Sequence, residues 1–111
     1  MNILIVHAHP EPLSFTTSLK TTAQQTFKKL GHRVEVSDLY AMQFNPVASK
    51  EDFLELNQPD YFNYALEQRN AAKQNLLAPD IQAEIEKVKR ADLIILNFPL
   101  YWTSVPAILK G

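Results

Sequence analysis

Histidines and hydroxyl side chains follow the first apolar stretch of this chain, where they could bind an anionic ligand. His7 and His9 are two residues apart, so at strand spacing both side chains lie on the same side of the backbone. A helix that begins near Ser14 would add free N–H groups and the positive end of its dipole, which together favour a phosphate. A helix start rich in Ser and Thr is more often only a cap, and His9 could equally have no ligand. The two histidines lack a third partner at metal-ligand spacing, so we expect no metal site.

Aromatic side chains follow the last apolar run, at residues 94–96. Tyr101 and Trp102 lie between Pro99 and Pro106, and the two prolines stiffen the loop that carries them. A flat ligand such as an isoalloxazine ring needs apolar contacts on its face and N–H groups at its polar edge, which a rigid loop can provide. The same aromatic residues could instead belong to an ordinary core, and this alternative stays open.

The elements around these residues indicate an α/β fold. Apolar or alternating runs predict strands at about residues 2–8, 33–38 and 92–98. A helix between Ser14 and Gly31 separates the first two strands, and this order predicts a right-handed crossover and a parallel pair. Because ligands bind outside the carboxyl ends of parallel strands, we expect the site at that edge of the sheet.

The connection between the second and third strands, about 40 residues long, exceeds an ordinary βα link. Such long insertions usually have a function or a contact of their own. The segment Ser49–Asp52 resembles a capping box, and apolar residues after it predict a short helix with Phe53, Leu54 and Leu56. A second helix would be lined by Tyr61, Tyr64, Ala65, Ala72 and Leu76. Pro79 opens a third helix, which leads into the third strand.

The composition is that of one soluble domain, with 111 residues, 46% of them hydrophobic and 21% charged. The net charge of −1 gives no electrostatic footprint for nucleic acid or an anionic membrane. No apolar run reaches the roughly 18–20 residues of a membrane span, and no secretory signal is visible, so we expect a cytoplasmic protein. The chain has two glycines and no Gly-rich motif, which argues against a dinucleotide fingerprint or a P-loop. Asp38 is then expected to be a turn residue at the end of a strand.

Several blocks of the sequence are specific enough to indicate a family. Ser37 opens the block S-D-L-Y-A-M-x-F-N-P, and Phe98 opens F-P-L-x-W, which is followed by V-P-A-I-L-K-G. Together with I-V-H-A-H-P near the N-terminus, they resemble the N-terminal part of the NAD(P)H:quinone oxidoreductase (DT-diaphorase) family. The resemblance implies a flavodoxin-like fold, which is a doubly wound parallel sheet, with strand order 2-1-3 in this part. Residues 1–111 would form one flavodoxin-like flavin-binding domain, incomplete at its C-terminus.

The resemblance also implies which residues bind the flavin. Asn63 matches a family glutamine that reaches the flavin from the long connection, and Trp102 would also form a wall of the substrate pocket. Thr16 replaces an asparagine of relatives and Thr103 replaces an aromatic residue, which affects the expected quinone specificity. The phosphate and ribityl side would be held by His9, Ser14, Phe15 and Thr16. The loop along the isoalloxazine ring would consist of Pro99, Leu100, Tyr101, Trp102 and Thr103.

The function implied by the resemblance is a flavin-dependent NAD(P)H:quinone oxidoreductase. A hydride would pass from NAD(P)H to the flavin, and two electrons would pass on to a quinone or another small acceptor. The long connection favours FAD over FMN, because relatives with this insertion bind FAD at a dimer interface, and we therefore expect a homodimer.

The alternative is a non-enzymatic flavodoxin-like module or a truncated flavin-binding fragment. The family's Tyr and His that assist hydride transfer, and its second flavin loop, lie beyond Gly111, so no catalytic residue is assigned. We expect the 111 residues alone to bind flavin weakly. Three strands would also leave the outer edge of the third strand unpaired, which predicts self-association.

Overall fold

The computed structural model describes all residues 1–111, and the chain divides into two compact units. The first unit consists of Met1–Pro46 and Glu86–Gly111, and the second consists of Val47–Ile85. No helix is both long enough and apolar enough to cross a membrane. The flavodoxin-like α/β architecture expected from the sequence is present in the first unit.

A three-stranded parallel sheet forms the centre of the first unit. Strand β1 (Asn2–His7) lies between β2 (Arg33–Asp38) and β3 (Leu93–Asn97), and the order β2-β1-β3 confirms the predicted 2-1-3 arrangement. In the register of the sheet, His7 faces Asp38 on one side and Asn97 on the other. Three polar side chains therefore meet at the carboxyl edge of the sheet, where this class of fold binds its ligands.

The core of the first unit is concentrated on the central strand. Ile3, Leu4 and Ile5 are at most 2% exposed, as expected for a strand with neighbours on both sides. The edge strand β3 is different, because Ile94 and Leu96 are 44% and 54% exposed. Its outer edge has no partner strand within this chain.

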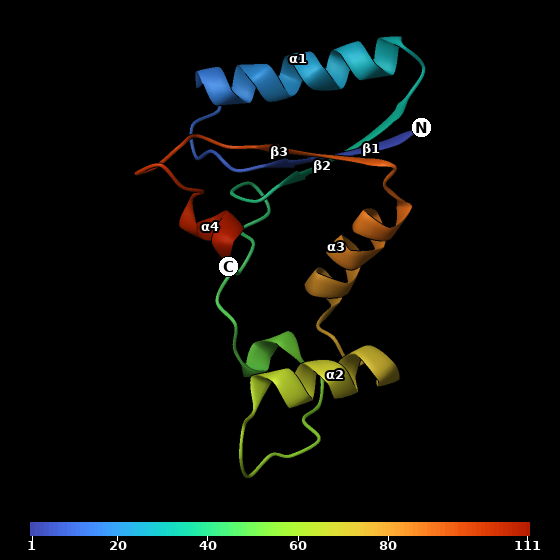
Figure 1. The fold of residues 1–111 in the computed structure, drawn as a ribbon, viewed down its shortest axis with the longest axis vertical. Coiled ribbons are helices and arrows are strands. Elements are labelled where there is room, and N and C mark those ends of the chain that lie inside the picture. Colours follow the sequence, from blue (N-terminus) through green and yellow to red (C-terminus); the bar gives the residue numbers. More distant parts are fainter. The chain divides into compact units, whose positions relative to one another are not determined.

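Helices lie on both faces of the sheet. Helix α1 (Phe15–Lys29) covers one face, as Figure 1 shows, and Ser14 caps its N-terminus as predicted. The C-terminal residues of α3 (Pro79–Arg90) contact the other face. There the Lys87 ammonium donates a hydrogen bond to the Ser37 hydroxyl, and Arg90 forms an ion pair with Glu35 at 2.8 Å. A short helix α4 (Ala107–Lys110) follows the loop after β3.

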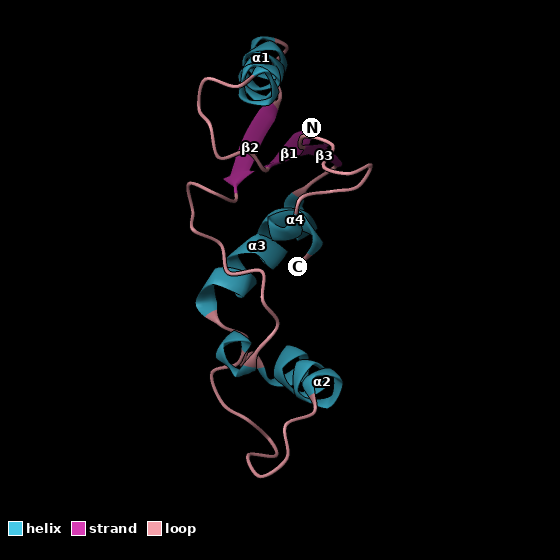
Figure 2. Ribbon diagram, turned by 90° about the vertical axis from the view of Figure 1, so that its left-hand side faces the viewer, coloured by secondary structure: helices cyan, strands magenta, loops and turns pink.

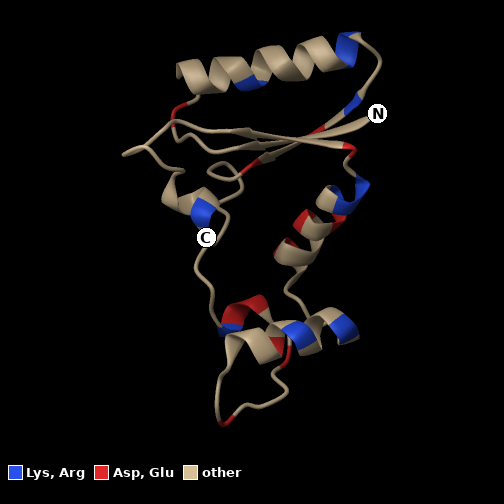
Figure 3. Cartoon of the chain, viewed as in Figure 1, with Lys and Arg blue, Asp and Glu red and all other residues tan.

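Basic residues are placed at the C-terminal end of α1. Lys28 and Lys29 occupy its last turn, which Figure 3 shows in blue, and they complement the negative end of the helix dipole. Gly31 follows the C-cap with a φ of +88°, a left-handed conformation that glycine adopts without a steric penalty. The helix therefore ends where the sequence predicted.

The second unit is helical, as the colouring by secondary structure in Figure 2 shows for residues 47–85. It contains the 3₁₀ helix η1 (Lys50–Asp52), helix α2 (Tyr64–Gln74) and the N-terminal part of α3. Phe53, Ala71 and Ala78 are buried and form a small core of their own. Figure 1 shows how η1 and α2 follow one another along the chain within this unit.

The predicted capping box is present, but the predicted helix after it is wrong. Ser49 and Asp52 cap each other's backbone N–H groups, yet the helix is η1 itself and ends at Phe53. Leu54 donates its N–H to the carbonyl of Leu76 at 2.7 Å, and Phe53 pairs with Leu77 in an antiparallel bridge. Backbone pairing with a distant segment holds Phe53 in extended conformation, and the chain bends at residues 54 and 55 in place of a helix. Helix α2 is also shorter than expected, since Tyr61 and Leu76 lie outside it.

Candidate functional site

His7 is a structural histidine at the carboxyl end of β1. Its side chain is 1% exposed, and both ring nitrogens have partners. Nδ1 lies 2.9 Å from the Asn97 amide nitrogen, and Nε2 lies 3.3 Å from Thr17 Oγ1. Burial lowers the pKa of His7, and the nearby Asp38 carboxylate opposes this shift. The imidazole therefore joins β1 to both β3 and α1 and is not open to a ligand.

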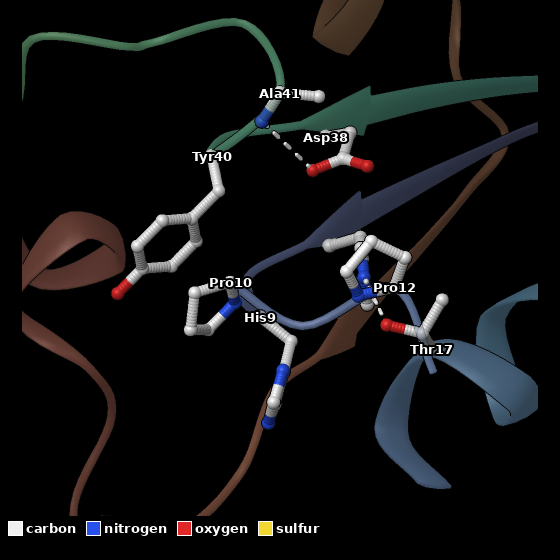
Figure 4. A pocket seen from close by; sticks show the side chains of 8 residues that line it. His9, Pro10, Pro12, Thr17, Asp38, Tyr40 and Ala41 are labelled. Atoms are coloured by element: carbon white, nitrogen blue, oxygen red, sulfur yellow. Dashed lines mark hydrogen bonds between the residues drawn. The ribbon is translucent and has the colours of Figure 1, made fainter. Parts of the chain in front are cut away.

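His9 lies in the loop after β1 and is partly exposed. Its Nδ1 accepts the N–H of Glu11 at 3.0 Å, which leaves Nε2 directed away from that turn. Figure 4 shows the His9 ring beside Pro10 and pointing away from Asp38. His9 therefore keeps one ring nitrogen for a ligand, whereas His7 has none to spare.

The start of α1 combines a cap with free N–H groups. Ser14 Oγ accepts the N–H of Thr17 at 3.0 Å and donates to Thr17 Oγ1 at 2.9 Å, so this hydroxyl is fully used in capping. The N–H groups of Phe15 and Thr16 have no acceptor in the chain. The capping role of Ser14 is therefore confirmed, and the unpaired backbone N–H groups beside it are of the kind that can bind an anion.

A cavity of about 310 Å³ opens at the carboxyl edge of the sheet, between the loop after β1 and the end of β2. Figure 4 shows Asp38 and Tyr40 on one side and the prolines on the other. Asp38 accepts the N–H of Ala41 at 3.2 Å, which confirms its predicted role as a turn residue. The lining residues are His7, His9, Pro10, Pro12, Thr17, Asp38, Tyr40 and Ala41.

The loop after β3 ends in a tight turn that presents Trp102 and Thr103. Tyr101 and Ser104 exchange two backbone hydrogen bonds of 3.0 Å, and the two residues between them have φ values of 52° and 64°. Residues with a Cβ adopt this left-handed region at a cost of roughly 1–2 kcal/mol each. Trp102 is 98% exposed, so it does not belong to the core. The turn holds an uncovered indole ring at the edge of the sheet.

Asn63 belongs to the second unit and caps α2. Its Oδ1 accepts the N–H of Leu66 at 3.2 Å, while its Nδ2 keeps its donors. Two buried carboxylates bind other groups of this unit. Glu67 accepts the N–H groups of Asn57 and Gln58 at 2.8 and 2.9 Å, and Asp52 accepts the hydroxyl of Tyr64 at 2.6 Å.

The structure connects the two predicted flavin segments of the first unit through Asn97. The Asn97 Nδ2 donates to the main-chain carbonyl of Thr16 at 2.9 Å, and the main-chain carbonyl of Asn97 accepts the N–H of Ala8 at 3.0 Å. Of the predicted residues, however, only His9 lines the cavity, and the loop at 99–103 does not. Sequence reasoning did not single out Asn97. A polar residue directly after the apolar run 94–96 was the available signal.

Comparisons with known proteins match the whole chain. A sequence profile of the family described as having a flavodoxin-like fold matches residues 1–111. The ribosyldihydronicotinamide dehydrogenase (quinone) of Pongo abelii is 54% identical over 110 residues, which are 98% of this chain and 48% of that protein. NAD(P)H dehydrogenase (quinone) 1 of Rattus norvegicus is 50% identical over 109 residues, which are 97% of this chain and 40% of that protein.

A solved structure is also similar to this chain over its whole length. The structure of a proposed quinone reductase from Klebsiella pneumoniae aligns with a TM-score of 0.96 at 40% identity, and the match covers 100% of this chain and 43% of that one. The chain thus spans 48% and 40% of the length of the two curated relatives.

Proposed function

This chain belongs to the family of the flavodoxin-like fold, and from that premise we propose that it forms part of a flavin-dependent NAD(P)H:quinone oxidoreductase. When bound, the flavin supplies two-electron hydride chemistry between a nicotinamide donor and a quinone acceptor. The observation that carries the proposal is the junction at the carboxyl edge of the sheet. There, Asn97 joins a helix start with free N–H groups to a loop with an uncovered indole ring.

The start of α1 suits the phosphate side of a flavin. The unpaired N–H groups of Phe15 and Thr16 lie at the positive end of a 15-residue helix, a natural anion site. Ser14 supports it by fixing the first turn through its cap, and His9 offers its Nε2 from the adjoining loop. These residues hold and orient the cofactor and take no part in the chemistry.

The loop after β3 suits the ring side. Leu100 and Trp102 are 73% and 98% exposed and provide apolar surface, with Tyr101 and the turn at Thr103 beside them. Pro99 stiffens the entry to this loop, and the short turn directs its side chains outward. We assign the isoalloxazine face to this loop and one wall of the quinone pocket to Trp102.

The finer parts of the proposal concern the flavin type, the assembly and the location. The long connection between β2 and β3 forms a compact unit of its own. On the family resemblance we assign FAD rather than FMN as the cofactor and keep Asn63, whose Nδ2 donors are unused, as a proposed cofactor residue. A homodimer in the cytoplasm would complete the site, with a quinone as the acceptor.

The test is the visible spectrum of the natural gene product that carries residues 1–111. We expect a flavin band that NADH or NADPH bleaches and that a quinone restores. Release of the cofactor by heat and chromatography identifies it as FAD or FMN, and light scattering gives the oligomeric state. A flavin band that neither nicotinamide nucleotide bleaches would favour a non-enzymatic flavin-binding module, and the absence of any flavin binding would refute the proposal.

A further inference from the structure

The amide of Asn97 determines the protonation state of His7. The carbonyl of Thr16 can only accept a hydrogen bond, so the Asn97 atom 2.9 Å from it must be the NH₂ group. The second hydrogen of the same NH₂ group faces His7 Nδ1 at 2.9 Å. Nδ1 must therefore be unprotonated and accept this bond.

The other ring nitrogen then carries the proton. Thr17 Oγ1 donates its single hydrogen to the carbonyl of Glu11 at 2.9 Å, so it can only accept from His7 Nε2 at 3.3 Å. It also accepts from Ser14 Oγ at 2.9 Å, and this satisfies the network. No buried side-chain nitrogen or oxygen is left without a partner. His7 is thus a neutral Nε2–H imidazole with both nitrogens in use.

We infer that His7 and Asn97 are positioning residues, which hold the phosphate-side helix start and the ring-side loop in one fixed arrangement only while His7 is neutral. This inference rests on the proposed flavin site. The network joins three elements whose next residues are the proposed cofactor contacts: His9 follows β1, Phe15 and Thr16 begin α1, and Pro99 follows β3. The ring nitrogens of His7 and the NH₂ group of Asn97 are used within this network, so we assign the two residues a positioning role and no contact with the flavin.

Protonation of His7 would break the junction at a defined atom. A proton on Nδ1 would point at the Asn97 NH₂ group, and two donors would then face each other in a buried space. The charged groups around His7 are the Asp38 carboxylate at the end of β2, Lys20 on α1 and His9 in the adjoining loop. Burial lowers the pKa of His7, so the neutral form persists at physiological pH. The arrangement should loosen only when the solution becomes clearly acidic.

The first experiment reads the tautomer without any cofactor. Long-range ¹H–¹⁵N spectra of the flavin-free protein should show His7 at neutral pH as a neutral ring with the proton on Nε2. In Asn97→Leu the Nδ1 nitrogen loses its donor, so its chemical shift and the pKa of His7 should change. A ring that is doubly protonated, or protonated on Nδ1, at neutral pH would overturn the inference whether or not flavin binds.

The second experiment measures flavin affinity by fluorescence titration with FAD and FMN at pH 7.5 and pH 5. We expect His7→Leu and Asn97→Leu to weaken binding at pH 7.5 by about tenfold, the consequence of one lost buried hydrogen bond. His7→Gln keeps a side-chain oxygen for Asn97 and does not titrate, so it should restore binding and remove the weakening that acid causes in the wild type. His32→Gln, far along the chain at the other end of α1, is the matched histidine control.

The outcomes separate the two proposals. Lack of flavin binding by the wild type at either pH would refute the proposed function. If the wild type binds flavin, and His7→Leu and His7→Gln bind it with the same affinity and the same pH response as the wild type, the positioning role alone is refuted. Loss of the acid response in a variant of His9 but not of His7 would also refute it.

Discussion

Replacement of Trp102 by alanine should separate function from stability. The side chain is 98% exposed, so its removal takes almost no packing from the folded chain. We therefore expect the free energy of unfolding to change by less than about 0.5 kcal/mol, as for other exposed positions. Alanine can occupy the same turn, since it meets the same backbone restriction as the tryptophan it replaces.

The expected loss in binding follows from the area of the indole ring. An aromatic side chain buries about 150–250 Å² when it is fully covered, so a flat ligand on one face would cover about 100 Å². At about 25 cal/mol per Å², this contact is worth about 2.5 kcal/mol, or about 60-fold in affinity. Flavin titration, quinone turnover and urea unfolding of Trp102→Ala measure the three quantities.

The control is Leu30→Ala, which removes another exposed apolar side chain from the far end of α1. It should change neither the stability nor the affinity for flavin. A clear loss of stability in Trp102→Ala, or unchanged flavin affinity together with unchanged acceptor kinetics, would refute the assignment of Trp102 to the cofactor site.

Three further predictions concern buried or capping groups. Glu67→Gln exchanges one acceptor oxygen for a donor that faces a backbone N–H, and it should lower the free energy of unfolding by about 1–3 kcal/mol, whereas the exposed control Glu55→Gln should not. The hydrogen bond to Asp52 raises the pKa of Tyr64 to about 12 from its ordinary value of 10. The neutral phenol therefore contributes stability that is complete below pH 10 and is lost as the pH rises towards 12; thermal unfolding across this range should show the loss in the wild type and not in Tyr64→Phe. Ser14→Ala removes the cap of α1 and should cost about 1 kcal/mol in chemical denaturation, while Ser14→Thr should retain most of the stability.

Local patterns were sufficient to predict the sheet and the long helix of the first unit. The apolar run at residues 3–6 indicated the buried central strand, and Ser14 and Gly31 marked the two ends of α1, because a cap and a left-handed glycine act within one turn of chain. The helix predicted after Ser49 was wrong for the opposite reason. Residues 53 and 54 are held by backbone pairing with Leu76 and Leu77, which no local pattern at residues 53–56 could reveal.

In the candidate site, too, features set by local sequence could be predicted and features set by distant contacts could not. Ser14, Asp38 and the exposed loop after β3 could be recognised from residue types at strand ends. The junction of His7 with Asn97 depends on the register of β1 with β3, which places two residues 90 positions apart side by side. The turn at Trp102 and Thr103 could not be predicted either, because neither residue favours positive φ. The proposed flavin contacts themselves stay predictions until a cofactor is bound.

The left-handed turn at residues 102 and 103 has a consequence for how this chain can evolve. Glycine or asparagine would adopt the same backbone more easily, and the change would release stored strain of about 1–2 kcal/mol per residue. Selection of random variants for thermal stability alone should therefore enrich Gly and Asn at these two positions and discard the indole ring. Selection for turnover should keep the tryptophan and accept the strain. The residues found at positions 102 and 103 after selection would then show whether a population was selected for thermal stability or for turnover.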